Sequence, residues 1–229
     1  GLTTNYADTH PHTDEIGEVI LDGLTNPVMY SKAAMKILFV LKEAIDESKQ
    51  GGWNHATYLN QDGVIDENDT HRRVSWIATG ILRNLLWEDN WEDLLEKDYE
   101  DDFRSIGWIN IGKFPAPKNG TTENGRLKHC FRYWKEIDLL QIEKYDPDII
   151  IFGYTFFLFE ENHEFMNRLS YLKTIADTRF YKDSEGRLYI NTFHPNVRNS
   201  TIETNVFINS IVQGVRDLDF RNKSMHWEN

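Results

Sequence analysis

Apolar residues in this chain fall into two patterns that alternate along the sequence. Four short continuous runs are rich in branched and aromatic side chains, as buried strands are: 35–41, 105–111, 148–153 and 187–193. Longer segments between and after them carry apolar residues at helical spacing: 71–87, 122–145 and about 200–218. Continuous apolar strands that alternate with helices indicate an α/β protein whose parallel sheet is covered on both faces.

Two further segments have weaker patterns. Residues 13–24 have a threonine cap and apolar spacing that suit a helix ending near Gly23. Residues 163–175 are weakly helical. For the helix over 71–87, the sequence offers Asp69 or Thr70 as the cap.

Composition limits the class of protein. The 229 residues suit a single domain, 1–229, and 40% apolar with 27% charged residues is typical of a soluble enzyme or binding domain. No run approaches the roughly 20 apolar residues of a membrane span, and we expect a cytoplasmic protein without a membrane partner. The single cysteine, Cys130, cannot form an internal disulfide, and no zinc-ligand spacing occurs, so we expect no metal and no cofactor.

Charge is distributed unevenly along the chain. The net charge of −12 argues by itself against a polyanionic partner. Residues 88–102, however, carry a local net charge of −8, and residues 110–135 one of +5. We interpret the acidic run as a solvated helix face and loop, with mimicry of DNA or docking to a partner as the alternative.

The strand ends predict where chemistry is located. In open parallel sheets, ligands bind beyond the carboxyl ends of the strands. Four segments follow the predicted strands and should meet at that edge: 42–48 (KEAIDES), 110–120 (NIGKFPAPKNG), 153–157 (GYTFF) and 194–200 (HPNVRNS).

The order of these motifs resembles the uracil-DNA glycosylase superfamily over about residues 35–215. The similarity is closest to the iron–sulfur branch, whose pattern runs G-E-A-P-G, then N-x-x-K-C-x-P-P, then a strand after a proline, then an H-P motif. The resemblance implies a three-layer α/β/α sandwich with a central four-stranded parallel sheet, and a pocket that accepts an extruded base.

The chain departs from that pattern in two places. Residues 42–46 read KEAID, so the loop lacks the proline and glycines that let backbone approach DNA phosphates. Phe114 stands near a family cysteine position and Cys130 is the lone cysteine, which excludes an iron–sulfur cluster because a cluster needs about four protein ligands.

Three residues are candidates for the chemistry of base release. Asn110 offers a donor and an acceptor that could read a pyrimidine edge, or it caps a turn. His194 could hydrogen-bond the oxygen that becomes anionic on the departing base, or it only precedes a proline turn. Glu43 could orient water or balance a developing sugar cation, or it forms an ion pair with Lys42 or Arg198.

The remaining candidates would hold the rest of the ligand. Trp53 or Phe156 could stack on the base, although aromatic residues are more often part of the core. Lys113 and Arg198 could contact phosphates, with a solvated surface role as the alternative.

Two classes of function remain open from the sequence. The first is a uracil-DNA glycosylase-like hydrolase that releases uracil or a damaged base from DNA. The second is a catalytically silent module on the same fold that binds a nucleobase, a nucleotide or a single strand. Retention of Glu43, Asn110 and His194 favours the first, whereas the altered loop and the acidic charge favour the second.

Overall fold

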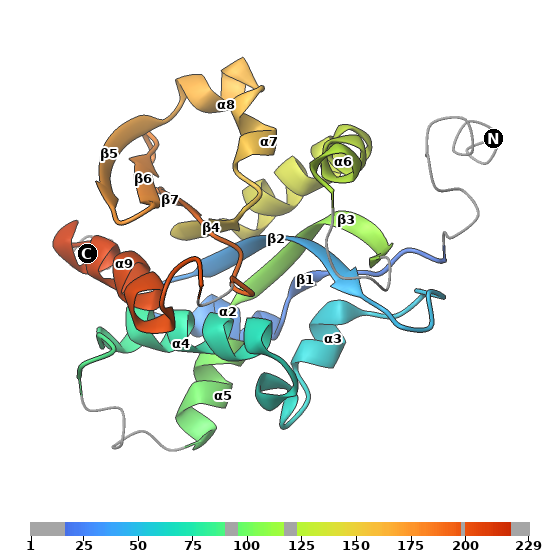
Figure 1. The fold of residues 1–229 in the computed structure, drawn as a ribbon, viewed down its shortest axis with the longest axis horizontal. Helices are drawn as coiled ribbons and strands as arrows, with labels where there is room; N and C mark the ends of the chain where they lie inside the picture. The colour runs from blue at the N-terminus through green and yellow to red at the C-terminus, as the bar shows by residue number, and fades with distance from the viewer. Residues whose placement is uncertain (1–16, 90–95, 117–122, 198–199, 221–229) are drawn as a thin grey trace.

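The computed structural model describes residues 17–89, 96–116, 123–197 and 200–220. Within these residues, one sheet of seven strands forms the centre, in the order β1-β3-β2-β4-β7-β6-β5 (Figure 1). The strands are β1 (Gly23–Leu24), β2 (Ile37–Ile45), β3 (Gly107–Ala116), β4 (Ile149–Gly153), β5 (Ser170–Ile175), β6 (Thr178–Lys182) and β7 (Leu188–Thr192). The protein is therefore of the α/β class that the sequence predicts.

The sheet has a parallel centre and antiparallel edges. Strands β3, β2, β4 and β7 are parallel neighbours, and each coincides with one of the four predicted apolar runs. Strand β1 pairs antiparallel with β3, and the β5–β6 hairpin continues the sheet antiparallel to β7. The sheet is thus mixed, and the three outer strands were not predicted.

Two segments that were predicted to be helical are largely extended. Residues 17–22, the described part of the predicted helix over 13–24, contain no helix, because their backbone pairs elsewhere: the N–H of Ile20 donates to the carbonyl of Lys113 at 2.7 Å. In the other segment, only His163–Asn167 is helical, and Ser170–Ile175 forms β5, whose backbone bonds go to β6. Tertiary pairing overrides a weak local helical pattern in both.

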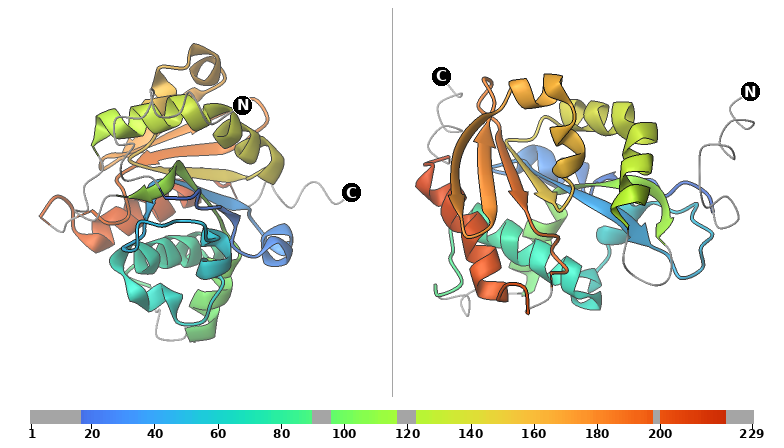
Figure 2. Two further views of the ribbon diagram at one scale, coloured as in Figure 1. Left: turned by 90° about the vertical axis from the view of Figure 1, so that its right-hand side faces the viewer. Right: turned by 45° about the horizontal axis from the view of Figure 1, so that its top comes forward.

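Helices cover both faces of the sheet. The helices are α2 (Pro27–Lys32), α3 (His55–Leu59), the 3₁₀ helix η2 (Val64–Glu67), α4 (Asp69–Arg83), α5 (Glu96–Arg104), α6 (Asn124–Tyr145), α7 (Phe157–Glu160), α8 (His163–Asn167) and α9 (Thr204–Asp217). Figure 2 shows yellow-green α6 on one side of the sheet and teal α4 and red α9 on the other. Alternate residues of β2 divide accordingly: Phe39 and Leu41 pack with α4 and α9, whereas Leu38 and Val40 pack with α6.

Local sequence explains where the two longest helices end. Helix α4 is capped by Asn68, whose side chain accepts the N–H of His71, one residue before the predicted cap. It ends where Asn84 adopts a left-handed conformation, with φ of 61°. Helix α6 ends at Asp146, also left-handed, before Pro147. Both helices therefore stop at residues suited to a C-terminal cap.

No helix in the described part of the chain is long and apolar enough to cross a membrane.

Candidate functional site at the carboxyl edge of the parallel strands

The ends of β2, β4 and β7 meet at one edge of the sheet. The register pairs Gly153 of β4 with Thr192 of β7. A Cβ added to Gly153 would lie 2.4 Å from Cδ2 of Leu41 and 3.6 Å from Cα of His194, so only glycine permits this approach. Lys42, which follows Leu41, and His194 therefore occupy the same edge.

His194 is held as a neutral imidazole with a defined tautomer. Burial, together with the positive charge of Lys42, lowers the pKa of His194 to about 3. Its Nδ1 accepts a hydrogen bond from the backbone N–H of Asn196 at 3.1 Å. Because Nδ1 is the acceptor of a neutral ring, the proton resides on Nε2, which makes Nε2–H a hydrogen-bond donor.

Lys42 and Tyr154 stand beside this donor. The ammonium of Lys42 lies 4.5 Å from the ring centroid of Tyr154, and burial lowers the pKa of Lys42. Tyr154 is exposed and has a left-handed backbone, with φ of 59°, directly after β4. The sequence analysis named Lys42 only as a possible ion-pair partner of Glu43 and gave Tyr154 no role. They place a cation and an exposed aromatic ring next to a neutral donor.

Glu43 is buried and paired. Its side chain is 1% exposed, and its Oε2 lies 3.3 Å from Nε of Arg126 on α6. An ion pair, the alternative role that the sequence offered for Glu43, is therefore present, and its partner Arg126 is a residue that the sequence analysis did not suggest. A Cβ on Gly112 of β3 would lie 3.0 Å from Oε2, so the carboxylate rests directly on the backbone of the neighbouring strand.

Asn110 lies within β3 rather than at its end. The strand continues to Ala116, so the prediction of a turn after Asn110 is wrong. The side chain is buried, and its Oδ1 accepts the indole N–H of Trp108 at 3.0 Å. Its backbone N–H donates to Oδ2 of Asp22 at 2.7 Å. Asn110 is level with Leu41 in the β2–β3 register, one layer below the edge where Glu43 lies.

Lys113 is not available to a phosphate in this structure. Its Nζ lies 2.9 Å from a carboxylate oxygen of Asp22 and 2.9 Å from one of Asp138, and 3.0 Å from Oε1 of Gln141. The Lys113 side chain is 5% exposed. The two carboxylates raise the pKa of Lys113 against the burial that lowers it. The alternative of a solvated surface role is also wrong, because the alternation of side chains along β3 points Lys113 inward against α6.

The two aromatic candidates differ in position. Phe156 is fully buried and stacks on Tyr181, with the ring centroids 5.0 Å apart, so it is a core residue and the structure contradicts a stacking role on a ligand. Trp53 lies in the loop after β2 and is half-buried, and its indole N–H donates to Asp46 at 3.1 Å. Arg198 lies outside the described residues.

Arg73 of α4 fixes the loop that carries His194. Its guanidinium is buried and donates to the backbone carbonyls of Pro195, at 2.7 Å, and of Val197. The sequence analysis missed this residue, although an arginine four residues before Ile77, on the apolar face of α4, was a signal for a buried partner.

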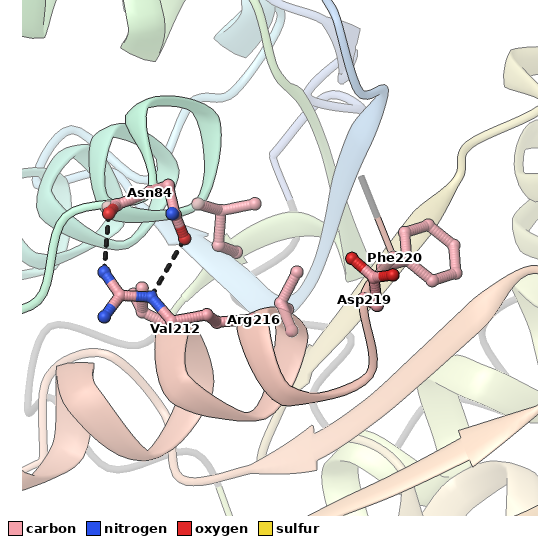
Figure 3. Close-up of a pocket in the computed structure, with 8 residues that line it drawn as sticks. Asn84, Val212, Arg216, Asp219 and Phe220 are labelled. Atoms are coloured by element: carbon pink, nitrogen blue, oxygen red, sulfur yellow. Dashed lines mark hydrogen bonds between the residues drawn. The ribbon is translucent and has the colours of Figure 1, made fainter. Parts of the chain in front are cut away.

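A hollow of about 200 Å³ lies away from this edge (Figure 3). It is lined by the C-terminal ends of α4 and α9, where Arg216 donates to Asn84 through Nε at 2.9 Å and through Nη2 to the carbonyl at 2.6 Å. Arg73, near the other end of α4, contacts the His194 loop. The hollow is thus at the opposite end of α4 from the candidate site.

Among the described residues, no group of three or more His, Cys, Asp or Glu is arranged to hold a metal ion. The sequence matches no protein-family model, and a search of curated proteins finds no match. The geometry of the edge and the order of the motifs are therefore the features that bear on function.

Proposed function

We propose that this protein is a uracil-DNA glycosylase-like hydrolase that releases uracil or a damaged base from DNA. Support comes from the parallel order β3-β2-β4-β7, flanked by helices, which agrees with the α/β/α sandwich that the motifs imply. The observation that carries the proposal is the neutral His194, with its proton on Nε2, beside Lys42.

The chemistry of base release suits this pair of residues. When the bond between the anomeric carbon and the base nitrogen breaks, the electron pair leaves with the base and its negative charge spreads onto a carbonyl oxygen. The neutral imidazole can donate its Nε2–H to that oxygen without transferring the proton, and the ammonium of Lys42 adds to the favourable field. Water supplies the hydroxyl group to the sugar and a proton to the base.

The other residues take supporting roles. Glu43 offers negative charge toward the developing sugar cation, reduced by its ion pair with Arg126. Because Oδ1 of Asn110 is engaged by Trp108, a contact between Asn110 and the base would run through Nδ2. Tyr154, exposed at the edge, is a better candidate for stacking than Phe156.

One observation favours the second function, a catalytically silent module that binds a nucleobase, a nucleotide or a single strand. Glu43 is almost fully buried in its ion pair, so it is poorly placed to activate water. A silent module would still bind the carbonyl oxygen of the base through His194 but would not cleave the glycosidic bond.

Release of uracil from single-stranded and double-stranded DNA under single-turnover conditions distinguishes the two. Loss of an oxyanion donor typically reduces the rate by about 10²–10³, so His194→Ala should do the same. The matched control is His163→Ala, which removes an exposed imidazole on α8 and should leave the rate unchanged. No release by the wild-type protein, together with uracil binding that His194→Ala weakens, identifies the silent module. If the wild-type protein neither releases nor binds uracil, both candidate functions are refuted.

A further inference from the structure

A second hollow, of about 190 Å³, lies between α6 and the α7–α8 turn. Its floor is apolar, made by the buried rings and methyls of Phe131 and Leu158. Its rim is polar and mostly basic: Lys128, Arg132, Lys135, Glu161 and Asn162. A small concave site with an apolar floor and convergent charged groups has the usual form of a ligand site.

The basic rim is unusual for a chain with a net charge of −12. Lys128, Arg132 and Lys135 lie four and three residues apart on α6, so they share one helix face, and like charges at these spacings destabilise a helix. Glu161 is the one carboxylate of the rim and pairs with Nζ of Lys128 at 2.6 Å. A hydrogen bond from Lys128 and the charges of Lys128 and Arg132 lower the pKa of Glu161, so this carboxylate lies near two of the three cations. The lining of the hollow still holds three cations against one carboxylate.

The pKa of a neighbouring histidine reports the same positive field. Burial, with a contribution from the charge of Arg132, lowers the pKa of His129, which follows Lys128 on α6. The rim therefore keeps an excess of positive charge that an anion would neutralise.

Both walls of the hollow begin at the carboxyl edge of the sheet. Helix α6 starts there, since Arg126 in its first turn pairs with Glu43. Helix α7 starts three residues after Tyr154, and the rings of Tyr154 and Phe157 lie 5.9 Å apart. Figure 1 shows α7 beside α6 on the same side of the sheet. A chain that leaves the edge over Tyr154 would therefore be led toward the hollow.

We propose that this hollow, bounded by Lys128, Arg132 and Lys135, binds the phosphodiester backbone of a single nucleic-acid strand whose base occupies the carboxyl edge. The inference rests on the proposed function and adds the path of the strand. Basic grooves next to exposed aromatic side chains are the usual arrangement for binding single strands. The three basic residues of the hollow would thus make the phosphate contacts that the sequence analysis assigned to Lys113, which is buried.

Binding of oligothymidylates of about 4–16 nucleotides, measured by fluorescence anisotropy over a range of salt concentrations, tests the proposal. Each neutralised phosphate of a single strand contributes about 0.7 to the slope of log affinity against log salt. Lys135→Gln should weaken binding and make that slope shallower by about 0.7, and Arg132→Gln should do the same. The control is Lys144→Gln, which removes the same charge from an exposed position outside the hollow on α6 and should change neither quantity.

Oligothymidylate contains no uracil, so this assay is independent of base release. Equal behaviour of Lys135→Gln, Lys144→Gln and the wild-type protein overturns the proposal, whatever the result for His194→Ala. Binding of inorganic phosphate that Lys135→Gln abolishes, without binding of any oligonucleotide, also overturns it and assigns the hollow to a free anion. Loss of oligothymidylate binding in the hollow variants, with no effect of His194→Ala on base release or uracil binding, supports the hollow and refutes the proposed function.

Discussion

Replacing Lys113 by methionine should strongly destabilise the protein. The substitution keeps most of the aliphatic stem but removes the ammonium that two buried carboxylates share. The side chains of Asp22 and Asp138 are 2% and 0% exposed, so neither carboxylate can regain solvent without opening the contact between β3 and α6. Gln141 would still donate to Asp22 at 2.8 Å, which satisfies one oxygen only.

The magnitude follows from the burial of the pair. Removing one partner of a buried ion pair typically costs about 3–5 kcal/mol in free energy of unfolding. At about 2–4 °C per kcal/mol for a chain of this size, the melting temperature should fall by roughly 6–20 °C. A surface lysine, as the sequence suggested, would change the stability by about 0.5 kcal/mol or less.

Urea and thermal unfolding of Lys113→Met, compared with Lys144→Met and carried out above pH 7, where Asp138 is ionised, measure the effect. Lys144 is on α6, the helix that carries Asp138, but its side chain is 69% exposed, so its substitution should change little. Adding Asp138→Asn to Lys113→Met should recover part of the loss, because it removes an unpaired buried charge. Equal melting temperatures for Lys113→Met and Lys144→Met would refute the buried network.

Three further predictions concern the residues around the site. Burial raises the pKa of Asp138 to about 7 from its ordinary value of 3.8, so the native state holds a proton that the unfolded state has lost in this range. The stabilisation that this proton provides is complete below pH 3.8 and is lost as the pH rises through 7. The free energy of unfolding of Asp138→Asn, measured in urea, should not show this decrease with pH. Gly153→Ala should cost about 1–3 kcal/mol through overpacking, whereas Gly125→Ala, with nothing within 4 Å of the added carbon, should not destabilise α6; equal unfolding midpoints would contradict this packing. Arg73→Ala should lower the melting temperature and speed amide exchange in the loop after β7, and Arg72→Ala, at an exposed side chain, should do neither.

The buried parallel strands were predictable because burial on both faces leaves a continuous apolar run. Strand β4 and residues 37–41 of β2 are buried throughout, and the apolar runs in the sequence show this directly. Strand β5 carries mostly exposed residues, so it lacks any such run, and the tight turn at Ala176 and Asp177 that joins it to β6 contains no glycine to mark it. Strand β1 also lacks such a run, and its two residues depend on β3 for every strand contact.

The candidate site was predictable in its location but not in its contacts. The backbones of Glu43, Gly153 and His194 lie at the carboxyl edge, although Glu43 and Gly153 belong to β2 and β4 and do not follow them. Lys113 was misjudged because its motif suggested a loop, although Ile109, Ile111 and Lys113 alternate along one buried face of β3. Its partner Asp138 lies four residues from Trp134 and from Ile142 on the inner face of α6, a placement that itself indicates a buried, paired carboxylate.

The claim common to both candidate functions is that His194 presents a neutral Nε2–H donor to an anionic oxygen at the carboxyl edge. Nitrogen NMR of the imidazole of His194, followed from pH 4 to 8 with and without uracil, measures this directly, with His194→Ala for assignment. The account predicts a ring protonated on Nε2 alone throughout that range, because the pKa of His194 is about 3, and a shift of the Nε2 signal when uracil is added. A ring that titrates near the ordinary histidine value of 6.5, or a proton on Nδ1, with no response to uracil, would contradict it.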